Sequence, residues 1–192
     1  MKKVLVLSLT WVVLVLSAQV PGESARATLA APEMHLRLVR DGRTRFHVEA
    51  EATVAAPKAV VWDTVRDYDH LSRFIPMLVT SHRTQYNGRP VIEQVGRANL
   101  MFIHFDAKAV LEETFDPGAD SLTLRAVSGD FVRFESSWHV KSISPTVTSI
   151  NVTSEAQLKR WVPQWLERWQ VRKTLAHSLR ALLIEMERRA PS

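Results

Sequence analysis

A histidine and a carboxylate stand close together at one point of the chain, where His104 and Asp106 flank Phe105. Because side chains two residues apart on a strand point to the same side, this pair could exchange a proton with a bound carbonyl compound. The hydroxyl group of Tyr68 could polarise a carbonyl in a similar way. Ordinary loop polarity explains the histidine and the aspartate better than catalysis does, and we therefore assign no catalytic residue.

Other patterns that carry chemistry are missing from the sequence. None of the seven histidines pairs with another at the spacing of metal ligands. The chain has no cysteine, which excludes a disulfide, a thiolate metal site and a cysteine nucleophile. No nucleophile elbow, phosphate-binding loop or dinucleotide fingerprint occurs. We expect neither a metal nor a cofactor, and these residues favour a binding protein over an enzyme.

The composition indicates one globular domain with a sizeable core, since 46% of the 192 residues are hydrophobic and 23% are charged. The formal net charge of +5 is spread along the chain instead of being collected in a run. We therefore do not expect nucleic acid as a partner. The positive charge leaves attraction to anionic lipid headgroups open.

The first residues have the pattern of an export signal. Two lysines after Met1 precede an apolar segment, 4–18, which is shorter than the roughly 20 residues of a membrane-spanning helix. Small residues follow, with cleavage expected after Ala18, Ser24 or Ala27. We interpret 1–27 as a signal peptide with its cleavage region, which predicts an exported, periplasmic protein. The alternative is an uncleaved segment that anchors the chain to the membrane at its N-terminus.

The elements that would position the candidate residues begin after 28–45, which we interpret as a linker or an early edge strand. Apolar and polar residues alternate over 46–54, which is the period of a half-buried strand. Two short consecutive helices are expected between Pro57 and Pro76, because proline suits the first turn of a helix and also stops one.

Six further strands follow, separated by turn residues such as Asn87-Gly88 and Ser144-Pro145. On one of them a single face should carry Val132, Phe134, Ser136, Trp138 and Val140. Such a run of strands joined by short turns predicts an antiparallel meander with one face buried.

The last predicted element is a long amphipathic helix from Pro163 to about Arg189, whose apolar residues recur every three or four positions. The simplest way to bury both apolar surfaces is to lay this helix against the sheet. We expect the α+β class, with a curved seven-stranded antiparallel sheet gripping the C-terminal helix. The order is strand, two helices, six strands and helix, in one ligand-binding domain over 46–192.

Three segments resemble a known family: AAPKAVVWDTVRDYD at 55–69, RFIP at 73–76 and GDFVRFESSW at 129–138. They are similar to the START-like, or SRPBCC, superfamily, in particular its polyketide cyclase and coenzyme Q-binding branch. The resemblance implies a helix-grip fold whose cavity, between sheet and helix, binds lipids, sterols, quinones, polyketides or plant hormones. Some members are cyclases. The chain departs from a common pattern at Ser136, where a glycine often stands two residues before the tryptophan.

Small residues on the inward face of the predicted sheet support a cavity, because they leave volume that the helix does not fill. The alternative is that they only let the helix approach closely, or that Trp165 and Trp169 fill the space. The predicted lining consists of Tyr68, Phe74, Ala107, Ala109, Leu124, Ala126, Phe134, Ser136, Trp138, Ile150, Val152, Ser154, Trp165 and Trp169.

The antiparallel order should bring several apolar turns to one end of the sheet, near the start of the long helix. This rim contains Met101, Phe102, Phe131 and Trp161, with Lys159 beside them. Tryptophan prefers the membrane interface and lysine attracts anionic lipid, so the rim is either the cavity mouth and a membrane-docking surface or a small packed end-core.

These features predict an exported, monomeric carrier of a hydrophobic small molecule of the lipid, quinone or polyketide class, with transient contact to a membrane surface. Binding of this kind needs no cofactor. Two alternatives stay open. One is an enzyme that resembles a polyketide cyclase or dehydratase, and the other is an envelope module that binds another protein through the apolar rim.

Overall fold

A computed structural model describes residues 33–100, 103–159 and 172–191, and it describes no side chains over 98–105. The described residues belong to one compact unit, Ala31–Ser192. Eight strands form a single antiparallel sheet in the order β1-β2-β8-β7-β6-β5-β4-β3. The strands are β1 Met34–Asp41, β2 Arg45–Val54, β3 Leu78–Tyr86, β4 Arg89–Leu100, β5 Ile103–Asp116, β6 Ser121–Gly129, β7 Phe131–Ser144 and β8 Val147–Leu158.

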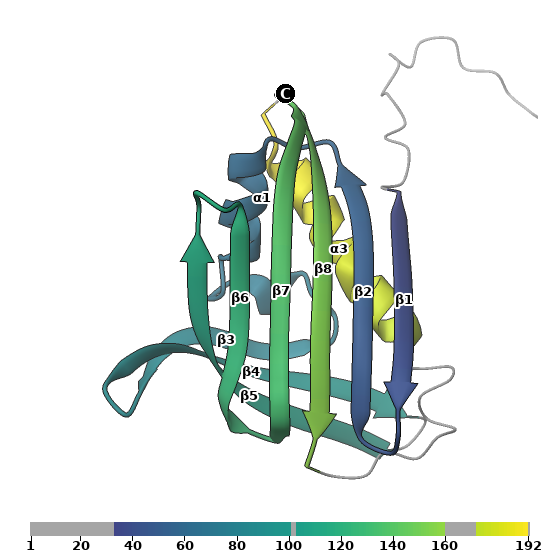
Figure 1. Ribbon diagram of the computed structural model, residues 1–192, viewed down its shortest axis with the longest axis vertical. Coiled ribbons are helices and arrows are strands. Elements are labelled where there is room, and N and C mark those ends of the chain that lie inside the picture. The colour runs from purple at the N-terminus through teal and green to yellow at the C-terminus, as the bar shows by residue number, and fades with distance from the viewer. Residues whose placement is uncertain (1–32, 101–102, 160–171, 192) are drawn as a thin grey trace, which may run out of the picture. The chain divides into compact units, whose positions relative to one another are not determined.

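The meander from β3 to β8 is confirmed, since each of these strands pairs with the next one along the chain. β2 then pairs with β8, from Arg45↔Gln157 to Val54↔Thr148, so the early strands join the far side of the meander. In Figure 1 the strands β3 and β4 run across the view, β5 begins across it and turns upward beside β6, and β7, β8, β2 and β1 run along it. The sheet is therefore strongly curved, and α3 (Arg172–Arg189) lies behind it.

The sheet has one strand more than the seven predicted. β1 lies within 28–45, the segment interpreted as a linker or an early edge strand, and it pairs along its whole length with β2. Half-buried residues alternate with exposed ones along β1. Met34 and Leu36 pack against the hydrophobic core, and Leu38 lies on the same side of the strand. The apolar Val39 among those exposed residues obscures the alternation in the sequence.

The helical elements agree with the predicted order of strand, two helices, strands and helix. α1 spans Lys58–Val65, and Pro57 stands directly before it. The second predicted helix is a single 3-10 turn, η1, over Leu71–Arg73. The Asp67 carboxylate bonds the His70 ring at 2.7 Å in the turns before η1, and Pro76 follows η1 closely and cannot continue a helix. The described part of the C-terminal helix, α3, confirms the predicted three- and four-residue spacing of buried positions.

The interior beside α1 is densely filled. The Trp62 ring packs edge-to-face on Phe115, with ring centroids 5.2 Å apart. The Thr148 hydroxyl donates to the carbonyl oxygen of Ala56 at 2.7 Å, which ties β8 to the start of α1. The residues with the least exposure gather here and include Val54, Val61, Tyr68, Leu111, Leu122, Val140, Ile150, Leu183 and Met186.

The C-terminal end of α3 is held against the segment after α1 by charged groups. Arg189 contacts the Asp67 carboxylate at 2.9 Å and the Glu185 carboxylate at 2.7 Å. The same guanidinium lies over the Phe74 ring, 5.4 Å from its centroid. This end of the helix is therefore fixed by two ion pairs and a cation–π contact.

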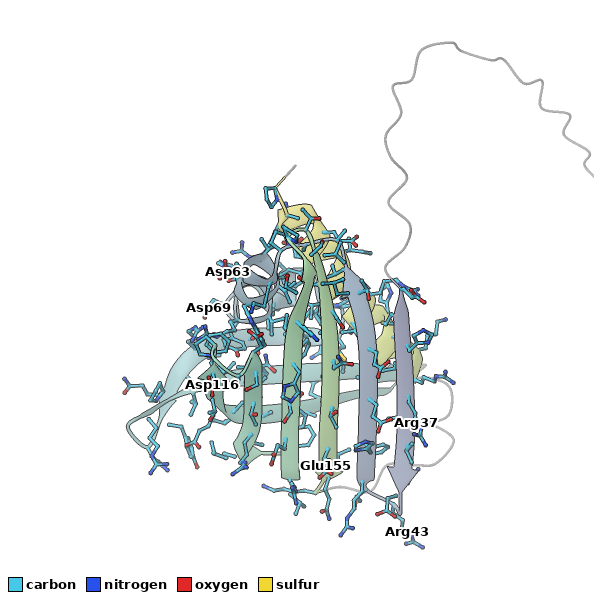
Figure 2. The ribbon with its side chains drawn as sticks, turned by 45° about the horizontal axis from the view of Figure 1, so that its top comes forward. Arg37, Arg43, Asp63, Asp69, Asp116 and Glu155 are labelled. Atoms are coloured by element: carbon cyan, nitrogen blue, oxygen red, sulfur yellow. The ribbon has the colours of Figure 1, made fainter. Side chains whose placement is uncertain are left out.

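The outer face of the sheet is polar. Arg37 on β1 and Glu155 on β8 lie on the side turned away from α3 (Figure 2). Ion pairs link neighbouring strands there, for example Arg37 with Glu49 at 3.4 Å and Arg133 with Glu155 at 3.6 Å. Of the helices in the described ranges, none is both long and apolar enough to cross a bilayer.

Candidate ligand-binding site

The inward faces of the central strands divide into two halves that differ in burial. On β2, Ala50, Ala52 and Val54 are buried, whereas Phe46 and Val48 farther from α1 are half-buried. Strands β5, β6 and β8 show the same change along their length, whereas on β7 Ser136 is buried and Trp138, nearer α1, is half-buried. We call the buried part, next to α1, the closed half. The open half comprises the inward-facing residues Phe46, Val48, Ala107, Ala126, Phe131, Phe134, Ser136, Trp138, Ser154 and Ala156.

Three aromatic side chains dominate the open half. Phe131, Phe134 and Trp138 are half-buried and pack at the edge of the core. Phe131 and Phe134 contact each other with ring centroids 5.3 Å apart. They can share one face although their spacing is odd, because a bulge interrupts the pairing of β7 with β8 between Phe131 and Arg133. The bulge turns Val132 outward, where it is 60% exposed, and the expectation that Val132 faces inward was wrong.

A small polar cluster lies in the middle of these apolar residues. The hydroxyls of Ser136 on β7 and Ser154 on β8 are 2.7 Å apart across a directly paired position. The Trp138 indole N–H donates to the Ser136 hydroxyl at 3.1 Å. All three groups are uncharged, so the cluster offers hydrogen bonds to a ligand without offering a charge.

The structure distributes the predicted lining residues between the two halves. Ala107, Ala126, Phe134, Ser136, Trp138 and Ser154 lie together in the open half, and Ala109, Leu124 and Val152 lie at its border with the closed half. Tyr68 and Ile150 are about 1% exposed and lie within the packed closed half. Phe74 is half-buried under Arg189. Trp165, Trp169, Met101, Phe102 and Trp161 lie outside the described residues.

The described turns at the open end meet as the antiparallel order predicts. The Lys159 backbone N–H donates to the carbonyl of Asp130, and its ammonium group donates to the carbonyl of Gly129. The Asp130 N–H in turn donates to the carbonyl of Lys108. These bonds place the end of β8, the turn between β6 and β7 and the start of β5 side by side.

The open half also reaches the outer surface between β6 and β7. The pairing of these strands ends at Arg125↔Glu135, although both strands continue beyond that point. A hollow of about 350 Å³ lies where they part, and its lining includes the inward-facing Ala126 and Phe134. A second hollow, of about 310 Å³, lies beside the β1–β2 hairpin, and polar residues such as Asp41, Arg45 and Glu155 line it together with Phe46 and Ala156 of the open half.

A charged group on the inward face was missed from the sequence. Glu113 follows Leu111 in the inward series of β5, and its side chain is 13% exposed. Arg66 contacts its carboxylate at 2.6 Å and Arg83 at 3.8 Å. Burial and the nearby Glu113 carboxylate raise the pKa of Tyr68, which keeps this phenol protonated. This network belongs to the closed half, where two guanidinium groups surround one carboxylate.

The candidate acid–base pair is not supported by what the structure shows of Asp106. Its carboxylate forms two bonds of 2.7 Å with the Arg97 guanidinium on the outer face. Alternation along β5 places Asp106 on the side opposite Ala107, away from the open half. The side chain of His104 lies outside the described residues. Among the described side chains, no three His, Asp or Glu residues gather in the manner of a metal site.

The curved sheet and its helix define a START-like helix-grip fold. The chain is similar to several solved structures with this fold. A START superfamily protein from Mycobacterium smegmatis is 20% identical, with a TM-score of 0.60 over 74% of this chain and 97% of its own. The ZhuI aromatase/cyclase from Streptomyces sp. R1128 is 18% identical, with a TM-score of 0.59 over 76% and 95%. A STAR-related lipid transfer protein from Xanthomonas axonopodis is 16% identical, with a TM-score of 0.60 over 86% and 96%.

The model of one protein family matches residues 54–183, which is well over half of the chain. Its description is "Polyketide cyclase / dehydrase and lipid transport". The chain belongs to this family, and the predicted resemblance is confirmed. No curated protein matches it in sequence. Because the family joins cyclases and lipid carriers on one ligand-binding fold, the choice between them depends on the residues of the site.

Proposed function

We propose that this protein binds and carries an apolar molecule of the lipid or quinone class in its open half, outside the cytoplasm. One observation carries the proposal. On β5 to β8, the described inward-facing residues of the open half are all uncharged, and Phe131, Phe134 and Trp138 leave part of their apolar surface uncovered. An uncovered apolar wall gains stability when an apolar ligand covers it, at roughly 25 cal/mol for each Å² removed from water.

The relatives agree with either carriage or catalysis, and the site favours carriage. A cyclase needs a group that donates or accepts a proton next to its substrate. Asp106 is paired with Arg97 on the outer face, and Tyr68 is packed in the closed half. Among the described residues, the polar groups that face the open half are serine hydroxyls and an indole N–H, which bind and orient a ligand without exchanging protons near neutral pH.

The proposed location follows from the sequence of the first 27 residues. A basic start, a short apolar segment and small residues after it are the parts of an export signal. Measuring the mass of the protein from its own host would show whether these residues have been removed. A carrier outside the cytoplasm must meet a membrane to exchange its ligand, so we include transient contact of the apolar rim with a membrane surface. We propose a monomer, without nucleic acid or cofactor.

Native mass spectrometry of protein purified gently from its own host tests the function. We expect an additional mass that corresponds to a lipid or quinone and that organic solvent extracts. The variant Phe134→Glu places a charge on the apolar wall and should lose this mass. Ile143→Glu places the same charge on an exposed side chain at the other end of β7 and should keep it. An empty wild-type protein, or equal loading of both variants, would contradict carriage in the open half and favour a cyclase or a protein-binding module.

A further inference from the structure

We propose that the open half selects neutral molecules that carry a hydroxyl or carbonyl oxygen and discriminates against the anionic form of the same skeleton. The inference rests on the proposed carriage function and names the class of ligand. It depends on three features of the described residues: a spare hydrogen-bond donor on the sheet, a buried hydroxyl on the helix and the pairing of the inward-facing charges.

The serine cluster on β7 and β8 has one donor more than it uses. It contains three donors, which are the Trp138 N–H and the hydroxyls of Ser136 and Ser154. The indole donates to Ser136, and one serine donates to the other. Whichever serine donates, the other retains an O–H proton that has no acceptor within the cluster. A ligand oxygen that accepts this proton would complete the cluster.

A second donor comes from the helix. Ser178 lies one turn before Leu182 on the buried side of α3, and the residue is 7% exposed. Its hydroxyl oxygen is buried and has no hydrogen-bond partner among the described residues. A buried hydroxyl without a partner costs stability, so its presence favours a ligand that supplies one. Sheet and helix thus each carry a neutral hydroxyl that could bond a ligand oxygen, and the inference includes that Ser178 does so.

The described cations near the interior are engaged elsewhere. In the closed half, Arg66 and Arg83 share the Glu113 carboxylate, and Arg189 contacts both Asp67 and Glu185. At the end of the open half, the Arg40 guanidinium lies over the Phe46 ring and donates to the carbonyl oxygens of Gly42 and Arg43. The Lys159 ammonium at the same end donates to the carbonyl oxygen of Gly129. For a carboxylate to gain a charged partner in the open half, one of these described cations would have to leave its present partner, and burying a carboxylate without such a partner is far costlier than burying an alcohol.

Retinol and retinoic acid form a matched pair of probes, because they share one skeleton and differ in a terminal alcohol or carboxylate. Binding of each to the purified protein, emptied by solvent extraction, can be followed at pH 8 through the quenching of tryptophan fluorescence. Methyl retinoate, which keeps the acceptor oxygens and removes the charge, is the third probe. We expect retinol and the ester to bind at least about tenfold more tightly than the acid, since a buried carboxylate lacks compensation.

Serine variants separate an anchoring role from a structural one. Ser154→Ala and Ser178→Ala should each weaken retinol binding about two- to tenfold, which corresponds to the loss of one hydrogen bond. Ser178→Ala removes a hydroxyl that has no described partner, so its thermal unfolding should stay unchanged or move upward. Ser137→Ala is the control, because it changes the adjacent, outward-facing serine of β7 and should leave binding unchanged.

Each outcome decides the inference. Tighter binding of the neutral probes, together with weaker binding by Ser154→Ala and Ser178→Ala, supports it. Equal affinity for retinol and retinoate overturns it while leaving carriage intact. Serine variants that bind retinol as the wild type does also overturn it. If no retinoid binds and no lipid copurifies, the proposed carriage function fails, and the ligand class fails with it.

Discussion

The closed and open halves are built from the same strands, and they differ in what covers their inward side chains. On β8, Thr148 and Ile150 are buried, whereas Ser154 and Ala156 are half-buried. α1 and the C-terminal turns of α3 pack on the closed half, where an aromatic pair and ion pairs complete the contacts. The comparison shows that dense packing at one end of a sheet can stabilise the fold, while uncovered apolar side chains at the other end remain accessible to a ligand.

Cavity-creating substitutions should separate the halves most clearly. Leu183 is 0% exposed in the closed half, and Leu183→Ala should lower the free energy of unfolding by about 3–5 kcal/mol. Phe134→Ala removes a half-buried ring from the open half and should cost about 1–2 kcal/mol, mainly lost transfer energy. Urea denaturation of both variants measures the difference. Equal losses would show that the open half is packed as densely as the closed one.

The inward-facing carboxylate of the closed half should matter more than its outward neighbour. Glu113→Gln leaves Arg66 and Arg83 without a charged partner and should destabilise the protein by about 2–3 kcal/mol. Glu112 forms an exposed pair with Arg89 at 3.4 Å, and Glu112→Gln should cost less than about 1 kcal/mol. Chemical denaturation distinguishes the two. A similar small effect at both positions would mean that the closed half does not depend on its buried charges.

A glycine at the open end tests how tightly the turns there are joined. Gly129 has φ +114°, and a Cβ at this position would lie 2.2 Å from the carbonyl oxygen of Lys108. Gly129→Ala should therefore destabilise the protein by about 2 kcal/mol. Gly42 also has a positive φ, of +71°, but nothing lies near its added Cβ, so Gly42→Ala should cost only about 1 kcal/mol. Thermal unfolding of both variants tests whether the clash with the Lys108 carbonyl adds to the cost of a positive φ in alanine. Equal losses in the two variants would show that it does not.

The smallest expected effect is a dependence on acid at the closed end. A hydrogen bond from Arg188, together with one from Arg189, lowers the pKa of Glu185 from its ordinary value of 4.5 to about 2. Above pH 4.5 the carboxylate is ionised in the folded and unfolded states, and its full stabilisation is present. As the pH falls toward 2, the unfolded chain takes up the proton first, so stability decreases.

Unfolding measured between pH 5 and pH 2 should show this decrease, and Glu185→Gln should make the curve flatter. Hydrogen bonds from His70 and Arg189 also lower the pKa of Asp67, although burial opposes them, so part of the decrease should persist in the variant. Glu155→Gln, on the outer face, is a control for removing one carboxylate elsewhere. A curve that Glu185→Gln leaves unchanged would argue against a contribution from this ion pair.

Much of the open half could be predicted from the period of the strands. Alternation alone placed Phe134, Ser136 and Trp138 on one face, because two-residue periodicity survives wherever the ladder is regular. It failed at Val132, because a bulge adds one residue to β7 there. Side chains before the bulge therefore point to the side opposite to the one that alternation predicts. For β1 it left a linker and an edge strand as alternatives, because the exposed Val39 obscures the alternation.

The sequence by itself determined the order of the elements, the family and the apolar alternation of most inward strands, since all of these follow from local patterns. Only the tertiary structure decided which of the inward residues are covered. Glu113 and Ala109 belong to the same inward series of β5, and only the position of Arg66 shows that the carboxylate is neutralised in the closed half. Burial and charge pairing depend on neighbours distant in the chain, and for this reason the division into closed and open halves could not be predicted from periodicity.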